Sequence, residues 1–285
     1  MILKAYAMNK LLFSLCIGVW LSACTATNED MGVTTRWQEE ALFNGEHPTL
    51  SFKEAAIGAK RGNASNQYQL AQMYEHGKEV GKDYRKAEYW YLKAARQGNI
   101  FAQDSLGWMY QDSLANFQKY IESTYWYRKA AEQGYAPAQN SLGFAYRFGT
   151  GVKRDYEKAI SWYLKASEQN YAPAQRNLGN IYEKGHGVQK DYFIAADWYH
   201  KAAENGDGRA ANYLGVLYRD GLGVKQNQQL ALKWFKKASD RNDYEGEQNL
   251  GSLNRLSFDQ YLVLAKGGDA HAQQELCHMY FNGDE

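Results

Sequence analysis

The residues of this sequence that could do chemistry are few and scattered. His271, Glu275 and His278 could share one face of the final helix, where such side chains can hold a metal ion, but ordinary surface placement explains the same pattern. The chain contains no motif of a serine hydrolase, a zinc peptidase or a phosphate-binding P-loop. We therefore expect no enzyme activity, no catalytic residue, no metal site and no cofactor.

Glycine-rich segments at residues 185–187 and 221–223 invite comparison with phosphate-binding loops. They lie 36 residues apart, and an equivalent Gly-Thr-Gly stands at 149–151. Because the loop recurs at a fixed interval, we interpret it as part of a structural repeat. The formal net charge is +1, with 33 basic and 32 acidic residues, so no basic surplus indicates nucleic acid binding.

The N-terminal segment is typical of a secretion signal. Lys10 precedes an apolar run of about ten residues, which is the length of a signal-peptide core and too short to span a bilayer as a helix. Residues 21–24, Leu-Ser-Ala-Cys, closely resemble the lipobox of bacterial lipoproteins; the alternative is an ordinary signal in which Cys24 is incidental. We predict a lipoprotein signal peptide over residues 1–23 and a lipid-anchored tether with a short N-terminal segment over residues 24–50.

Lipidation of Cys24 has consequences for location. One acyl chain holds a protein weakly at a membrane, whereas two or more anchor it stably. The resemblance implies three chains, palmitate among them. Residue 25 is Thr, not the Asp that favours inner-membrane retention. The resemblance therefore implies a lipid anchor in the outer membrane, with the protein facing the periplasm.

A Trp-Tyr pair recurs every 36 residues and determines the architecture. It stands at 90–91, 126–127, 162–163 and 198–199, and as Trp-Phe at 234–235. Self-similarity with a period of about 20–50 residues marks stacked repeats, because each short unit must bury its apolar stripe against its neighbours. We predict an all-α fold, an α/α solenoid of about six helix pairs over residues 51–285 that forms a right-handed superhelix.

Residues 136–171 show the design of one repeat. Pro137 starts a first helix, in which Gly143 allows close approach of a neighbouring helix. Paired glycines then break the chain, and Asp155 caps a second helix whose apolar stripe includes Trp162 and Tyr163. At the N-terminal end of the stack, Ser51 to Glu54 has the spacing of a capping box and should open a further helix.

The repeat resembles the Sel1-like repeat family, a relative of the tetratricopeptide repeats with a longer unit. The pattern is Ala-x3-Leu-Gly-x2-Tyr, then Gly-x-Gly-Val, Asp, Trp-Tyr and Lys-Ala-Ala. One copy reads Leu178-Gly179, Tyr182, Gly185-His186-Gly187-Val188, Asp191, Trp198-Tyr199 and Lys201-Ala202-Ala203. The resemblance extends from about residue 51 to the end of the chain.

Three departures from the pattern stand out. Residues 113–116 replace the glycine loop of their repeat, so this loop should have its own shape. Leu250 and Leu276 are only 26 residues apart, which predicts a shortened repeat between them. Cysteine-rich members of the family are linked to penicillin binding and β-lactam hydrolysis, but the cysteine pair of each of their repeats is missing here.

The resemblance implies that the first helices line a concave face that binds a partner. Counting from the repeated leucine, we expect the positions two before, two after and five after it to point into this groove. Large aromatic and Arg side chains are typical binding hot spots. The candidates for partner binding are Tyr68, Trp108, Phe144, Arg147, Arg176 and Arg219. The alternative for Trp108 and Phe144 is that they only fill the packing between repeats.

Three functions follow from these patterns. The first is a lipid-anchored scaffold or adaptor that binds an envelope protein in its groove, without a small-molecule substrate. The second is an immunity lipoprotein that neutralises a toxic effector such as a lipase in the periplasm. The third, a β-lactamase-like or other cell-wall enzyme, would need a polar cluster that the sequence does not show.

Overall fold

A computed structural model describes residues 50–112, 117–254, 262, 265–267 and 273–274. Within these ranges the chain forms twelve helices and no strand. The described helices all belong to one compact unit that begins at Phe52. The predicted signal peptide, Cys24, the tether, the loop 113–116 and most of the shortened C-terminal repeat lie outside the described residues.

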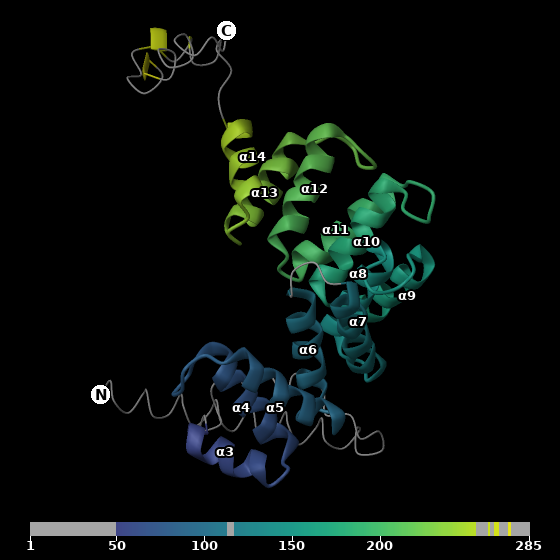
Figure 1. Cartoon of the computed structure of the whole chain (residues 1–285). Helices are drawn as coiled ribbons and strands as arrows, with labels where there is room; N and C mark the ends of the chain where they lie inside the picture. Colours follow the sequence, from purple (N-terminus) through teal and green to yellow (C-terminus); the bar gives the residue numbers. More distant parts are fainter. Residues whose placement is uncertain (1–49, 113–116, 255–261, 263–264, 268–272, 275–285) are drawn as a thin grey trace, which may run out of the picture. The chain divides into compact units, whose positions relative to one another are not determined.

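The helices alternate between the two members of each predicted pair (Figure 1). The first helices are α4 (Ala64–His76), α6 (Ile100–Asp112), α8 (Ala136–Phe148), α10 (Ala172–Lys184), α12 (Gly208–Asp220) and α14 (Tyr244–Asn254). The second helices are α5 (Tyr84–Arg96), α7 (Phe117–Glu132), α9 (Tyr156–Ser167), α11 (Tyr192–Glu204) and α13 (Gln228–Ser239). The helix predicted after the capping box is α3 (Phe52–Lys60), which precedes them.

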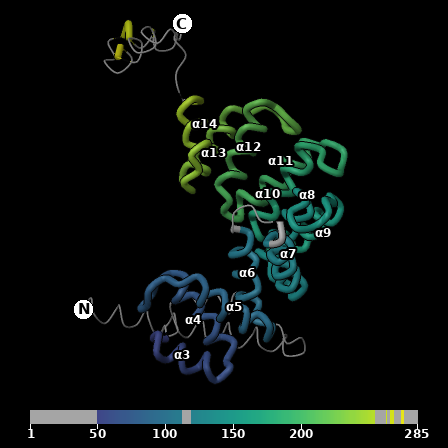
Figure 2. Tube along the Cα trace, viewed as in Figure 1, coloured from purple at the N-terminus to yellow at the C-terminus, as the bar shows by residue number. Residues whose placement is uncertain are grey.

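Each helix packs against its neighbours in the chain. A first helix contacts the second helix of its own pair, and that second helix contacts the next first helix (Figure 2). The helix α3 packs on α4 in the way that the second helices pack on the following repeat. Contacts of this sequential kind are those of a repeat protein, and the predicted all-α repeat fold is confirmed.

Local capping explains where the helices begin and end. Pro173 stands in the first turn of α10, as Pro137 does in α8, where a missing N–H leaves no bond unmade. Gly149 ends α8 with φ of 76°, in the left-handed region that favours glycine. Asp155 caps α9, since its Oδ1 accepts a hydrogen bond from the Lys158 N–H at 3.0 Å. The predicted helix signals of this repeat are confirmed.

A glycine meets an aromatic ring in each helix pair from α6 and α7 to α12 and α13. A Cβ atom placed on Gly143 would lie 2.8 Å from the ring of Tyr163, which is fully buried. Gly107, Gly179 and Gly215 meet the rings of Tyr127, Tyr199 and Phe235 in the same way. In these four repeats the glycine after the repeated leucine therefore lets the second helix approach the first.

The tryptophans lie farther out than their tyrosine neighbours. Of the two residues expected on one apolar stripe, Tyr163 is fully buried, whereas Trp162 is only partly buried. The Nζ atom of Lys165 lies 4.1 Å from the ring centroid of Trp162. The second helices α5, α11 and α13 also have a Lys over their Trp ring, as in Lys201 over Trp198. The Lys three residues after each of these Trp thus covers its ring by a cation–π contact.

A ladder of amide side chains adds polar contacts between repeats. The buried Gln103 donates from Nε2 to the carbonyl of Ala95 at 3.0 Å and accepts from Gln133 Nε2 at 2.8 Å. Gln67, Gln139 and Gln175 repeat this arrangement at the same period. Because buried amides need partners, the ladder fixes the register between repeats.

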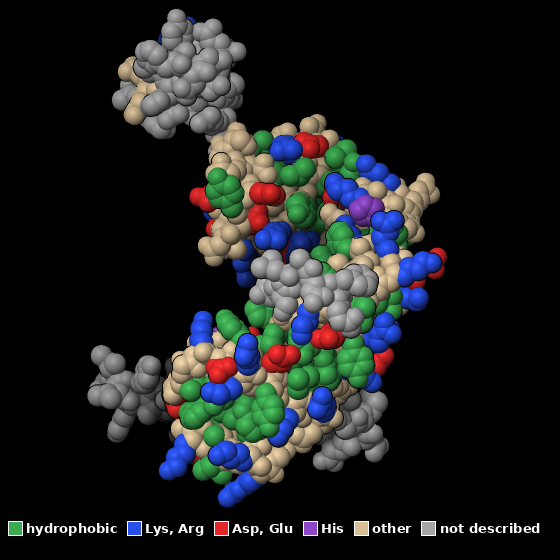
Figure 3. Space-filling view, in the orientation of Figure 1, with side chains coloured by type: hydrophobic (Ala, Val, Ile, Leu, Met, Phe, Trp, Pro, Cys, Tyr) green, Lys and Arg blue, Asp and Glu red, His purple; other side chains and the backbone are tan. Residues whose placement is uncertain are grey.

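None of the helices in the described ranges is both long enough and apolar enough to cross a membrane. Surface side chains are mixed, with hydrophobic groups set among many Lys and Arg side chains (Figure 3).

Candidate functional site

Two of the predicted contact residues carry large exposed rings at equivalent positions of successive repeats. Trp108 on α6 has 55% of its surface exposed, and Phe144 on α8 has 39% exposed. Both stand two residues after the repeated leucine, which is itself buried. Both rings therefore leave a large part of their surface in water.

Phe148 belongs to the same group, and sequence reasoning missed it. It is 52% exposed, and its ring centroid lies 4.4 Å from that of Phe144, one helical turn earlier on α8. Residues four apart on a helix are neighbours, so the spacing could have revealed this pair. We call Trp108, Phe144 and Phe148 the aromatic group.

Tyr68, a further candidate, is partly buried by other rings. Its ring centroid lies 5.7 Å from that of Tyr91 and 5.8 Å from that of Phe101 on the next first helix. Its hydroxyl accepts a hydrogen bond from Gln72 Nε2 at 2.8 Å. The ring therefore helps to join α4, α5 and α6.

In three repeats the residue five after the repeated leucine accepts a hydrogen bond from the buried tyrosine of the second helix. Tyr91 donates its hydroxyl hydrogen to Glu75 Oε2 at 2.5 Å, Tyr127 donates to Gln111 Oε1 at 3.0 Å, and Tyr199 donates to Glu183 Oε2 at 2.6 Å. Burial and then the Glu75 carboxylate raise the pKa of Tyr91. A buried phenol needs an acceptor, and these side chains provide it.

Arg147 occupies this position in its repeat and is only 9% exposed. Its Nη2 donates to Asn180 Oδ1 on α10 and lies 3.3 Å from His186 Nδ1, while its Cζ lies 5.0 Å from the centroid of Phe148. Arg147 Nε and the hydroxyl of Tyr163 are both buried and make no hydrogen bond within the described part of the chain. The predicted groove arginine is therefore largely enclosed.

The imidazole of His186 lies beside this arginine. Arg147 carries only donors, so His186 Nδ1 must be the acceptor and Nε2 must carry the proton. Burial lowers the pKa of His186, and the neighbouring cations Arg147, Lys184 and Arg154 lower it further. The imidazole also stacks on Tyr156, with ring centroids 5.5 Å apart and an interplanar angle of 8°.

Arg176 joins two repeats through an ion pair. Its Nε lies 2.9 Å from Asp207 Oδ2, and both side chains are mostly buried. Asp207 also caps α12, since its Oδ1 accepts a hydrogen bond from the Ala210 N–H at 2.8 Å. This arginine therefore holds α10 against the start of α12, and only part of its guanidinium faces outward.

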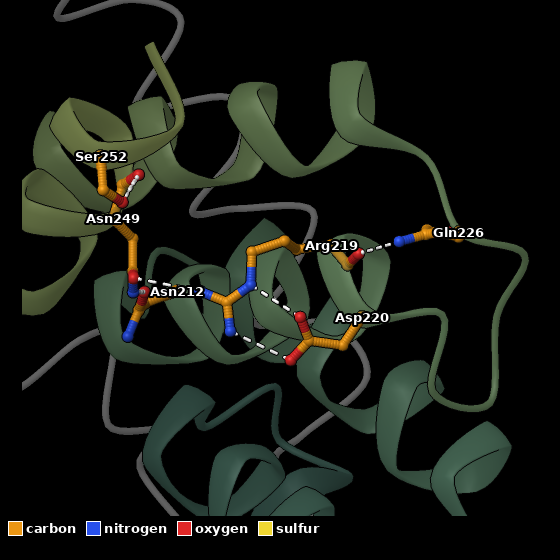
Figure 4. Close-up of polar contacts among 6 residues, drawn as sticks. All are labelled: Asn212, Arg219, Asp220, Gln226, Asn249 and Ser252. Atoms are coloured by element: carbon orange, nitrogen blue, oxygen red, sulfur yellow. Dashed lines mark hydrogen bonds and ion pairs between the residues drawn. The ribbon is translucent and has the colours of Figure 1, made fainter. Parts of the chain in front are cut away.

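Arg219 is neutralised by its neighbour in sequence (Figure 4). Its Nε lies 2.7 Å from Asp220 Oδ1 and its Nη2 lies 3.0 Å from Asp220 Oδ2, a bidentate arrangement. Asn249 and Asn212 are bonded to each other at 2.8 Å and connect α14 to α12 beside it. The positive charge at this point is balanced within the chain.

The described residues hold no group of three His, Cys, Asp or Glu side chains that could bind a metal. His271, Glu275 and His278 lie outside the described residues. Among the candidate residues, the exposed area comes mainly from the rings of the aromatic group.

Comparisons with known proteins agree with the repeat pattern. A family model described as Sel1 repeat matches residues 67–99, 100–135, 136–171, 172–207, 208–243 and 270–285. A search of curated protein sequences gives no match.

The solved structures that are similar to this chain include two proteins with about one-third sequence identity. A protective antigen of uropathogenic Escherichia coli strains, described as displaying an SLR fold, is 32% identical over 82% of this chain with a TM-score of 0.69. The match spans 52% of the antigen, about half its length. A Sel1 repeat protein from Oxalobacter formigenes is 33% identical, with a TM-score of 0.64, over 69% of this chain and 80% of its own.

Proposed function

Since the chain belongs to the Sel1 repeat family, whose helical repeats serve as scaffolds for protein–protein interaction, we propose that it is a lipid-anchored scaffold or adaptor of the bacterial envelope. In this proposal the first-helix face of the stack binds a protein partner. The aromatic group forms the apolar centre of that surface.

The exposure of the aromatic group carries the proposal. Trp108, Phe144 and Phe148 leave large apolar rings in water on two consecutive first helices. Apolar area gains free energy when a partner removes it from water, and aromatic rings lose little conformational entropy on binding. Hot spots of protein interfaces are enriched in such residues.

The three candidate arginines have lesser roles in this surface. Arg176 and Arg219 already pair with Asp207 and Asp220, and Arg147 is enclosed beneath Phe148. We therefore assign the binding free energy mainly to the aromatic group. The arginines set the local charge around it.

The proposal is tested by capture of partners on the full-length chain carrying a C-terminal affinity tag. The test bait is the double variant Trp108→Ser/Phe144→Ser, and the matched control is Tyr89→Ser/Phe193→Ser. The control removes two exposed rings from the second helices α5 and α11. Circular dichroism and melting curves of all baits confirm that they are equally folded.

We expect a protein that is held by the native and control baits and lost from the test bait. An envelope component as that protein supports the scaffold role. A toxic effector supports the alternative immunity role, which uses the same surface. Equal capture by all three baits would exclude the first-helix face as the binding surface.

The lipid anchor is a separate part of the proposal. It rests on Cys24 after the Leu-Ser-Ala sequence at residues 21–23 and on the signal-like segment before it. Two or more acyl chains hold a protein stably at a membrane, and Thr25 favours the outer membrane. Cys24→Ser should move the protein to the soluble fraction, and membrane retention of this variant would refute the anchor.

A further inference from the structure

A charged pocket lies where the N-terminal ends of α12 and α14 meet α10. It has a volume of about 260 Å³ and is lined by Arg176, Arg209 and Arg241, together with Asp207 and Asp243. Its arginines come from three separate parts of the chain: α10, the first turn of α12 and the turn before α14. We call it the arginine pocket.

The charges of the arginine pocket do not balance. Asp207 is engaged by Arg176, and Asp243 accepts a hydrogen bond from the Gly246 N–H at 2.8 Å as the cap of α14. Across the described ranges, neither Arg209 nor Arg241 forms an ion pair. Three guanidinium groups against two carboxylates leave a net charge of +1. The starts of two helices add further positive potential.

Gly206, in the turn before α12, and Gly208, the first residue of α12, allow Arg241 to lie along one wall of the pocket. A Cβ atom on Gly208 would lie 2.9 Å from the Cβ atom of Arg241, and one on Gly206 would lie 3.4 Å from its Nη1. A larger residue at position 208 would therefore displace Arg241. The position of this guanidinium is a consequence of the local sequence.

We propose that the arginine pocket binds a single carboxylate of the protein partner, either its C-terminal carboxylate or an Asp or Glu side chain. The inference rests on the proposed scaffold function and specifies the chemistry of its partner. Arg presents a planar fork that binds carboxylates with two parallel hydrogen bonds. A net charge of +1 matches one carboxylate, whereas the two Asp side chains oppose a doubly charged phosphate.

The test follows the arginine side chains directly. The full-length protein in mild detergent, labelled with ¹⁵N-arginine, gives side-chain Nε–H signals that single Arg→Gln variants assign. It is titrated with three N-acetylated pentapeptides built from Ala and Leu. The first has a free C-terminal carboxylate, the second has a C-terminal amide and no charge, and the third has a C-terminal amide and one internal Glu. Inorganic phosphate is titrated separately.

We expect saturable shifts of the Arg209 and Arg241 signals with one or both carboxylate peptides and none with the uncharged amide. The tighter of the two carboxylate peptides identifies the source of the carboxylate. Arg209→Gln/Arg241→Gln should weaken this binding about tenfold, as expected when hydrogen bonds to a charged group are lost. Arg85→Gln, which removes an exposed charge on α5, should leave the affinity unchanged.

Three results would overturn the inference: no saturable shift with either carboxylate peptide, tighter binding of phosphate than of both peptides, or equal weakening by Arg85→Gln. Such a failure is distinct from failure of the proposed function. The scaffold role would still stand if the Trp108→Ser/Phe144→Ser bait loses its partner.

Discussion

Repeats 136–171 and 208–243 place an arginine at the same position and use it differently. Arg147 and Arg219 each stand five residues after the repeated leucine. Arg147 is 9% exposed, and its guanidinium bonds to Asn180 beside Phe148. The Arg219 side chain is 35% exposed and forms a bidentate ion pair with the adjacent Asp220.

The residue that follows the arginine explains the difference. Asp220 forms an ion pair with Arg219 at the surface of α12. Phe148 has no carboxylate, and its ring lies over the guanidinium of Arg147. The repeat determines the position of the residue on the helix, whereas the residues next to the side chain determine where its charged group lies. One repeat thus exposes aromatic surface and the other neutralises its charge.

The largest expected loss of stability comes from deleting the buried aromatic ring that both repeats contain. Tyr163→Ala and Phe235→Ala each delete a fully buried ring, so each should lower the free energy of unfolding by about 3–5 kcal/mol. Trp162→Ala should cost less than Tyr163→Ala because Trp162 is only partly buried. Urea unfolding of the three variants tests this, and a Trp162→Ala cost equal to that of Tyr163→Ala would contradict the structure.

Closing the space beside these rings should have the next largest effect. The Cβ of Gly143→Ala would lie 2.8 Å from Tyr163, and that of Gly215→Ala 2.6 Å from Phe235, so each should destabilise by about 1–3 kcal/mol. Gly251→Ala on α14 meets nothing within 4 Å in the described part of the chain and is the control. It should be neutral or slightly stabilising, since Ala favours helix. Equal loss in all three variants would exclude ring contact as the cause.

Replacing Arg147 or Arg219 should affect stability differently, and the two effects should depend differently on salt. Arg147→Met removes an enclosed cation without a carboxylate partner but also its hydrogen bond to Asn180 Oδ1, so it should cost about 1–3 kcal/mol, independent of salt. Arg219→Met removes an exposed ion pair and should cost at most about 1 kcal/mol, less at high salt. Thermal unfolding at low and high salt measures both, and a salt-dependent loss in Arg147→Met would contradict this account.

Helix caps give the smallest difference between the repeats. Asp155 caps α9 and Asn227 caps α13 with the same geometry. The hydrogen bond from the Lys158 backbone lowers the pKa of Asp155 below its usual value of 3.8. Its contribution to stability is therefore present above that value and is lost as the pH falls through the lowered pKa. Asn227 does not titrate.

Asp155→Asn should accordingly change little at pH 7 and should lessen the loss of stability below pH 3.8. Urea midpoints measured at neutral and acidic pH provide the comparison. Asn227→Asp is the reciprocal variant and should add acid sensitivity. If stability falls identically with pH in the native protein and in Asp155→Asn, the Asp155 cap does not contribute to the loss of stability in acid.

Features with a fixed period were predictable from the sequence. The helix pairs, the caps such as Asp155 and the close approach at Gly143 follow from local rules that each repeat restates. The greater burial of Tyr163 than of Trp162 was not predictable, because adjacent helical residues point about 100° apart and the period marks both equally.

The partners of the charged residues were not predictable for a different reason. Arg176 meets Asp207 and Arg147 meets Asn180, in each case in the following repeat. Such pairs depend on how repeats stack, which the period alone does not specify. The arginine pocket brings Arg209 and Arg241 together in the same way, and no spacing rule in the sequence singles them out. Phe148 was a missed opportunity, since it lies one turn from Phe144.

The most direct test of the binding surface is photo-crosslinking in cells that produce the protein. The photoreactive amino acid p-benzoylphenylalanine replaces Phe144 on the first helix α8 or, as the control, Phe193 on the second helix α11, which is 72% exposed. We predict a discrete crosslinked partner from position 144 and none from position 193. A partner crosslinked from position 193 but not from position 144 would contradict binding on the first-helix face.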